Sequence, residues 1–257
     1  TVWAFMSPPN TVYALIPVHY QQIFLIALVS GIVMLLRYPD AWFKKHASLL
    51  IFSSGITIFA VAQVVWMFPF EAFRILSHED GYIEYLQVFS LLLAAFWSAK
   101  IARNFFLRTP PPITFWVVFG LTALLLFFVA GDEIAWGQRI FEIQTPQALS
   151  EQNTQGEITV HNLKSVQGTV DIGYLLLGAW GAFAWLLQPL FRFLRKPPYA
   201  YVIPPWFTSF YFLLGFVYFV WARYFPNQII GHWSEFAELM VYTGVMWTLY
   251  GIAFLKK

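Results

Sequence analysis

The sequence contains no cysteine and few charged residues. Of its 257 residues, 11% are Asp, Glu, Lys or Arg, whereas 59% are hydrophobic. The absence of cysteine excludes a disulfide framework, a thiolate metal site and a cysteine nucleophile. Soluble domains usually carry about 25% charged residues. A chain so poor in charge therefore lacks the polar surface that a soluble domain of this length needs.

The sequence also lacks the common signatures of nucleotide and hydrolase chemistry. It has no GxxxxGK[ST] phosphate loop, no GxGxxG turn, no GxSxG elbow and no HExxH zinc motif. Basic residues are not concentrated outside the short connections between apolar segments. We therefore predict no nucleic-acid partner.

Long apolar segments recur along the chain. A helix needs about 20 mainly apolar residues to cross a bilayer, and seven segments approach or exceed that length. We predict an all-α, polytopic transmembrane bundle that forms a single domain over residues 1–257. The seven predicted spans are 18–36, 47–70, 82–101, 113–136, 171–191, 205–225 and 233–255.

Charge is distributed unevenly between the connections. Most of the 15 Lys and Arg follow the first, third, fifth and seventh segments, and basic connections stay in the cytoplasm. We therefore predict a cytoplasmic C-terminus, an outer N-terminus and a multi-pass location in the bacterial inner membrane. Nearly all Asp and Glu fall on the opposite side, which the positive-inside rule does not predict, so the acids need another explanation.

The most polar stretch of the chain is 131–162, and it overlaps the longest outer connection, 140–168. Thr145-Pro146 predicts the start of a short interfacial helix over 146–152. Asp132 and Glu133 are consecutive, so their side chains diverge by about 100° on a helix. We expect one of them to face the bundle and the other the lipid headgroups.

Acids inside apolar segments are the strongest functional signal. An ionised side chain costs about 2.5–3.5 kcal/mol at mid-bilayer, so such residues usually face a functional site. On this basis we predict that Glu84, Glu133, Glu235 and Glu238 are catalytic. The alternative is structural, with an acid that caps a helix or is protonated and bonded to a neighbouring helix.

Three histidines and one further acid fall on the same predicted outer side: His78, His161, His232 and Asp80. Imidazoles together with carboxylates suit zinc, iron or manganese, so these four residues are the predicted ligands of a divalent metal. Their spacing matches no common metal motif. The alternative is that the histidines are polar surface groups and that Asp80 caps a helix.

Small residues in the fifth segment predict helix contacts. Gly173, Gly178 and Gly181 allow close approach of a neighbouring helix, which membrane bundles use for packing. We expect all three to lie against another helix.

Three segments carry a resemblance to a known family. They are His78-Glu-Asp-Gly-Tyr-Ile-Glu84, Gly131-Asp-Glu-Ile-Ala-Trp-Gly-Gln-Arg139, and Asn153-Thr-Gln-Gly-Glu157 followed by His161-Asn162. They resemble the ED-G-x-x-E, GEEISWGQR-like and N-x-Q-G-E…HN segments of an uncharacterised bacterial family of polytopic membrane proteins. No activity is assigned to that family, so the resemblance implies no function. Asp132 departs from the Glu expected there.

A looser likeness is to the seven-span, ceramidase-type membrane hydrolases, which hold zinc inside a helical bundle. The span count and the intramembrane polar site agree with that likeness, whereas the paired-histidine helix of those enzymes is absent.

Three functions are compatible with these features. The first is a metal-assisted hydrolase or transferase that acts on a membrane lipid at the outer leaflet. The second is an accessory subunit of a larger respiratory or photosynthetic complex, which would dock other membrane subunits through 140–168. The third is a proton- or cation-coupled transporter, in which Glu84 and Glu238 relay protons.

Overall fold

The computed structural model describes residues 41–67, 82–108, 112–138, 141–197, 199–224 and 233–255. The chain divides into two compact units, Thr1–Ala47 and Ser48–Lys257. In the first unit only the beginning of helix α2 (Ala41–Met67) is described, and all other described residues belong to the second unit. The predicted span 18–36 lies outside the described residues.

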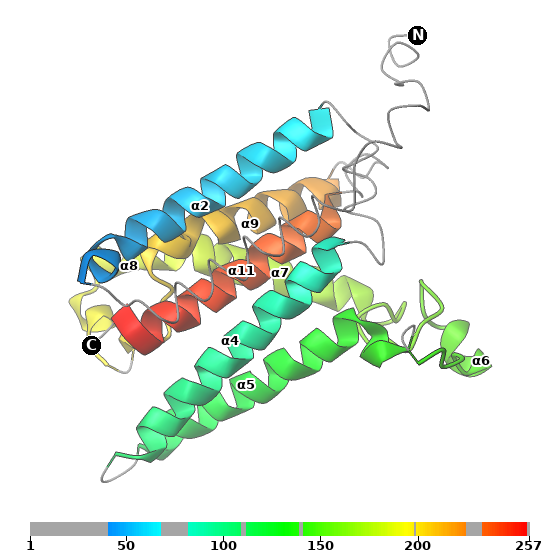
Figure 1. The fold of residues 1–257 in the computed structure, drawn as a ribbon, viewed down its shortest axis with the longest axis horizontal. Coiled ribbons are helices and arrows are strands. Elements are labelled where there is room, and N and C mark those ends of the chain that lie inside the picture. The colour runs from blue at the N-terminus through cyan, green and yellow to red at the C-terminus, as the bar shows by residue number, and fades with distance from the viewer. Residues whose placement is uncertain are drawn as a thin grey trace. The chain divides into compact units, whose positions relative to one another are not determined.

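The regular elements of the described ranges are all helices (Figure 1). Six long helices correspond to the second to seventh predicted spans: α2 (Ala41–Met67), α4 (Tyr82–Phe106), α5 (Ile113–Glu133), α7 (Gln167–Phe183), α9 (Ser209–Tyr224) and α11 (Ser234–Tyr250). The shorter elements are η3 (Ala135–Gly137), α6 (Gln147–Ser150), η4 (Ala184–Leu186), α8 (Leu187–Leu190), η5 (Arg192–Arg195), η6 (Tyr199–Tyr201), η7 (Trp206–Thr208) and the π-helix η8 (Gly251–Leu255).

Five of the described helical segments are long and apolar enough to cross a membrane, by length and composition. The described part of the protein is therefore all-helical with several candidate membrane spans, as predicted. The number seven and the orientation of the termini remain predictions. The five segments are His46–Gln63, Tyr82–Phe106, Ile113–Glu133, Gln167–Leu190 and Tyr199–Tyr224.

Helix α11 is at the centre of the bundle. It packs against α4, α9 and α7, while α4 also packs against α5 and α7 against α9 (Figure 1). Most side chains of α11 are buried around its whole circumference. Helix α5, in contrast, exposes Leu121, Leu124 and Leu125. A helix that is apolar on an outward face suits contact with lipid, whereas Glu235 and Glu238 belong to the helix that the other helices surround.

The close contact between α7 and α9 depends on glycine. A Cβ atom at Gly181 would lie 2.0 Å from the ring of Phe212, and one at Gly178 would lie 2.9 Å from the backbone nitrogen of Phe216. The prediction is confirmed for these two residues. It is wrong for Gly173 within the described residues, where a Cβ atom would meet nothing within 4 Å, because none of the described helices lies at contact distance from that side of α7.

Gly181→Ala is therefore expected to lower the thermal unfolding midpoint in detergent. The added methyl group forces the buried Phe212 ring to move, and overpacking of this kind costs about 1–3 kcal/mol. Gly173→Ala is the matched control, because alanine is favoured over glycine in a helix by about 1 kcal/mol and has open space there. Equal midpoints for the two variants would contradict this account.

Candidate functional site

A left-handed turn follows directly after α5 ends at Glu133. Residues 135–137 have φ values of 45°, 54° and 75°, a region that costs energy for any residue with a side chain. The ring of Trp136 folds back over Gly131, where a Cβ atom would lie 2.7 Å from it, and makes an edge contact with Phe128 at 5.2 Å. This packing offsets the strain of the turn and requires glycine at 131.

The segment after the turn is held by its own side chains. The Asn153 amide donates to the carbonyl and the hydroxyl oxygen of Thr159, both at 2.9 Å, and its Oδ1 accepts from the backbone N–H of Gln155 at 2.9 Å. The Asn162 amide donates to the Gln155 side chain. Gly156 has a φ of 74°. The N-x-Q-G-E…HN pattern is therefore explained by a loop that braces itself, which we call the 153–162 loop.

Gln138 fastens this loop to the turn. Its Oε1 accepts from the backbone N–H of Ile158 at 2.8 Å, and its Nε2 donates to the hydroxyl of Thr145. The short helix predicted over 146–152 is present as α6. The reason given for it is wrong, because the hydroxyl of Thr145 is engaged with Gln138 and the helix has no side-chain cap.

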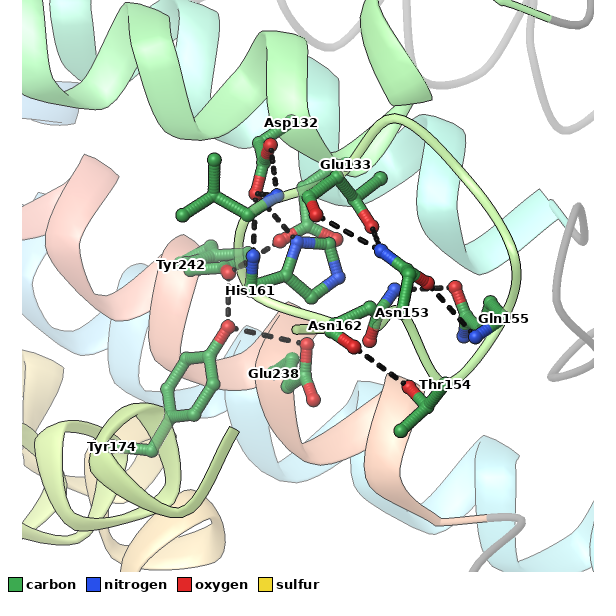
Figure 2. Close-up of polar contacts among 12 residues, drawn as sticks. Asp132, Glu133, Asn153, Thr154, Gln155, His161, Asn162, Tyr174, Glu238 and Tyr242 are labelled. Atoms are coloured by element: carbon green, nitrogen blue, oxygen red, sulfur yellow. Dashed lines mark hydrogen bonds and ion pairs between the residues drawn. The ribbon is translucent and has the colours of Figure 1, made fainter. Parts of the chain in front are cut away.

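Asp132 is the attachment point of the 153–162 loop to α5 (Figure 2). Its carboxylate accepts from the backbone N–H of Val160 at 2.9 Å, from that of His161 at 3.0 Å, and from Nδ1 of the His161 ring at 2.7 Å. Asp132 is only 4% exposed. Bonds to an ionised acceptor are about twice as strong as neutral ones, so this carboxylate fixes both the loop and the ring.

The imidazole of His161 is oriented by this contact. Because Nδ1 donates to Asp132, the neutral ring has Nε2 as its free acceptor. The ring lines a cavity, so Nε2 can be reached from it. Burial lowers the pKa of His161, but the bond to Asp132 and the negative charges of Glu133 and Glu235 outweigh burial and raise that pKa above its ordinary value.

Glu133 points into the bundle on a different side. Its Oε1 accepts from the hydroxyl of Tyr242 at 2.7 Å. The expectation that either Asp132 or Glu133 faces the headgroups is wrong. Their side chains diverge as predicted. The 153–162 loop folds back over the end of α5 and covers Asp132, while Glu133 is bonded to Tyr242 of α11.

The predicted catalytic acids and His161 line one cavity of about 380 Å³. They come from α4, α5, the 153–162 loop and α11, so segments far apart in sequence converge there. The roles assigned to them remain predictions. The acids that line this cavity are Glu84, Glu133, Glu157, Asp171, Glu235 and Glu238.

One of these acids, Glu235, is positioned by a buried amide. Gln87 is 0% exposed, and its Nε2 donates to the backbone carbonyl of Glu235 at 2.8 Å and to its Oε2 at 3.1 Å. Glu84 and Gln87 are three residues apart, so they lie on one face of α4. The structure shows that this face of α4 meets the beginning of α11.

Sequence reasoning missed part of the cavity wall. Asp171 and Arg223 line the cavity, but neither is among the site residues predicted from the sequence. Tyr174, three residues after Asp171, bonds to Tyr242 and Glu238. The spacing of Asp171 and Tyr174 on one face of α7 was the available signal.

The predicted metal centre is only partly placed. His161 lines the cavity, whereas His78, Asp80 and His232 lie outside the described residues. Within the described ranges, no group of three or more His, Cys, Asp or Glu is arranged to hold a metal ion. A metal at this site therefore remains a prediction.

Comparisons with protein-family models, curated proteins and solved structures found no match to this chain. A functional conclusion therefore depends on the geometry of the cavity and on the chemistry of the groups that line it.

Proposed function

We propose that this protein is a membrane-embedded hydrolase or transferase that acts on a lipid, with His161 as general base. The observation that carries the proposal is the 2.7 Å contact between Nδ1 of His161 and Asp132, in the wall of the acid-lined cavity. A base needs one ring nitrogen held by an orienting group, so that the other nitrogen can take a proton from water or a hydroxyl. Asp132 acts as a positioning residue in this proposal.

The carboxyl groups of the cavity can act as the general acid that complements the base. A reaction that removes a proton from a nucleophile must also return one to a leaving group, and paired groups in different environments perform these two steps. We assign the general acid to the carboxyl groups of α11 and α5, with Glu133 and Glu238 the best connected among them. Glu84 and Glu235 line the same cavity and would bind the polar part of the substrate.

The apolar part of the cavity wall favours a lipid substrate. Ile172 and Leu175 of α7 and Phe219 and Ala222 of α9 line the cavity beside its acids. Exposed apolar residues continue along these two helices, and Ile172 itself is 47% exposed. An amphipathic molecule could therefore place its headgroup among the acids and its chain along α7 and α9. The predicted orientation would put this site in the outer leaflet of the bacterial inner membrane.

The proposal predicts that His161→Ala abolishes most turnover. The full chain would be assayed in vesicles containing glycerophospholipids and sphingolipids, with products detected by mass spectrometry. Loss of a general base typically reduces the rate by about 10²–10⁴-fold. The fold should survive, because Asp132 keeps both of its backbone donors.

Glu151→Gln is the matched control for this assay, because Glu151 is exposed and lies outside the cavity-lining set. Turnover that His161→Ala leaves unchanged would overturn the role of His161. Absence of turnover on every lipid, together with co-purification of other membrane subunits, would favour the accessory-subunit alternative.

A divalent metal has a separate test. The imidazole and carboxylates are donors of the right kind, but the described residues do not arrange three of them around one point, so no step is assigned to a metal. Elemental analysis of the protein and of Glu235→Ala decides the matter. Stoichiometric metal that the variant loses would support a metal-assisted reaction, and active protein without metal would exclude it.

A further inference from the structure

A continuous chain of hydrogen bonds connects two acids of the cavity through two tyrosines (Figure 2). The hydroxyl of Tyr242 lies 2.7 Å from Oε1 of Glu133. The hydroxyls of Tyr242 and Tyr174 contact each other, and that of Tyr174 lies 3.2 Å from Oε2 of Glu238. The chain therefore runs from the end of α5 across α11 to α7 and back to α11.

The hydrogens of this chain do not balance if both acids are ionised. Three oxygen-to-oxygen contacts need three hydrogens, and each tyrosine hydroxyl has only one. If Tyr242 donates to Glu133 and Tyr174 donates to Glu238, the two hydroxyl oxygens face each other without a hydrogen between them. A third proton, on one of the two carboxyl groups, satisfies all three contacts.

We propose that Glu133, Tyr242, Tyr174 and Glu238 form a proton relay that holds one proton for two carboxyl groups. With the proton on Glu133, each group donates to the next, in the direction of Glu238. With the proton on Glu238, every donor is reversed. The two arrangements use the same oxygen positions and differ only in which oxygen each hydrogen is bonded to.

Transfer along the relay is balanced and moves no electrons. The O–H bond of Glu133 breaks as its proton passes to the oxygen of Tyr242. The proton of Tyr242 passes to Tyr174, and that of Tyr174 forms a new O–H bond on Glu238. The net result is one proton moved from α5 to α11.

The two tyrosines are shielded from water. Tyr174 and Tyr242 are 9% and 6% exposed, and neither is among the residues that line the described cavity. Tyr174 is also stacked on Phe219 at 4.8 Å. Both carboxyl groups do line the cavity. The relay therefore passes behind the cavity wall and connects two groups that a substrate can reach.

The surroundings favour a single ionised carboxyl group in the relay. Two ionised acids linked by short bonds in a bundle interior repel each other, and paired carboxyl groups commonly share one proton for this reason. The charged groups that face the same cavity from the neighbouring elements are His161, Glu84, Glu157, Asp171, Arg223 and Glu235; Asp132, bonded to His161, lies behind them.

This relay goes beyond the proposed function and does not require a known substrate. If the proposed reaction is correct, the relay resets the site, because a proton that reaches Glu133 near His161 becomes available at Glu238. If the proposed reaction is wrong, the shared proton should still be present.

Infrared spectroscopy of the full chain in lipid nanodiscs tests the relay without an activity assay. We expect a carboxylic-acid carbonyl band that shifts in D₂O. Tyr242→Phe and Tyr174→Phe each remove one hydroxyl and the two contacts that it makes, so both should shift or abolish this band. Glu133→Gln and Glu238→Gln should each change it as well, since the proton belongs to both acids.

Tyr211→Phe is the matched control, because Tyr211 is equally buried and its hydroxyl bonds to Ser54 at 2.6 Å, outside the relay. It should leave the band unchanged. The proposal is overturned if the wild-type protein has no such band, or if the band is insensitive to both tyrosine variants. It is also overturned if only one of the two Gln variants affects the band, because the proton would then reside on a single acid.

Discussion

Asp132→Ala is expected to release the 153–162 loop from the end of α5. The substitution leaves the backbone N–H groups of Val160 and His161 and the Nδ1 of the His161 ring without their acceptor. Removing one partner of a buried charged pair costs about 3–5 kcal/mol, and unsatisfied buried donors cost about 1–3 kcal/mol each. Water can reach part of the loop, so we expect a loss of about 3 kcal/mol.

Hydrogen exchange of the 153–162 loop measures this effect directly, alongside the thermal midpoint. Asp132→Asn should be intermediate, because an oxygen in the place of Oδ1 can still accept from the backbone N–H of Val160, whereas an amide nitrogen in the place of Oδ2 cannot accept from the backbone N–H or from Nδ1 of His161. Glu151→Gln, on the exposed side of the connection, should resemble wild type. Unchanged protection of the loop in Asp132→Ala would show that Asp132 does not hold it.

The helices were largely predictable because their signal is local. Apolar segments of span length correspond to α2, α4, α5, α7, α9 and α11. The first and last residues of the helices were less predictable, because tertiary contacts determine some of them. Helix α5 ends at Glu133 rather than at 136, because Trp136 folds back over Gly131 in a left-handed turn. Helix α7 begins at Gln167, before the polar Asp171 that suggested a boundary.

The acids of the cavity were predictable for a physical reason, and their partners were not. A carboxyl group in an apolar segment needs a compensating environment, which identified Glu84, Glu133, Glu235 and Glu238. Which group compensates each acid depends on long-range folding. Nothing local to Asp132 indicates that a loop 28 residues later supplies its donors. The spacing of Asp171 and Tyr174 places both on one face of α7, but it does not identify Glu238 as the partner of Tyr174.

His161 is expected to give the stability and the activity of the protein opposite dependences on pH. Burial lowers the pKa of His161, but the bond to Asp132 stabilises the protonated ring, and the pKa is raised in the folded state. This stabilisation is fully present below the ordinary value of 6.5 and is lost as the pH rises through the raised value. The thermal midpoint should therefore fall over that interval, and His161→Gln should remove this part of the slope.

The catalytic rate should change in the other direction, because a general base acts only when it is neutral. Turnover should rise as the pH passes through the raised pKa, where stability falls. Asp132→Asn removes the charge that raises this pKa, so it should move both transitions to lower pH. His46→Gln, on α2 and outside the cavity-lining set, should move neither. The protonated form of His161 stabilises the loop, whereas the neutral form performs the reaction, so stability and activity are highest on opposite sides of its pKa. If Asp132→Asn moved the stability transition and left the activity transition unchanged, or the reverse, the base would be a group other than His161.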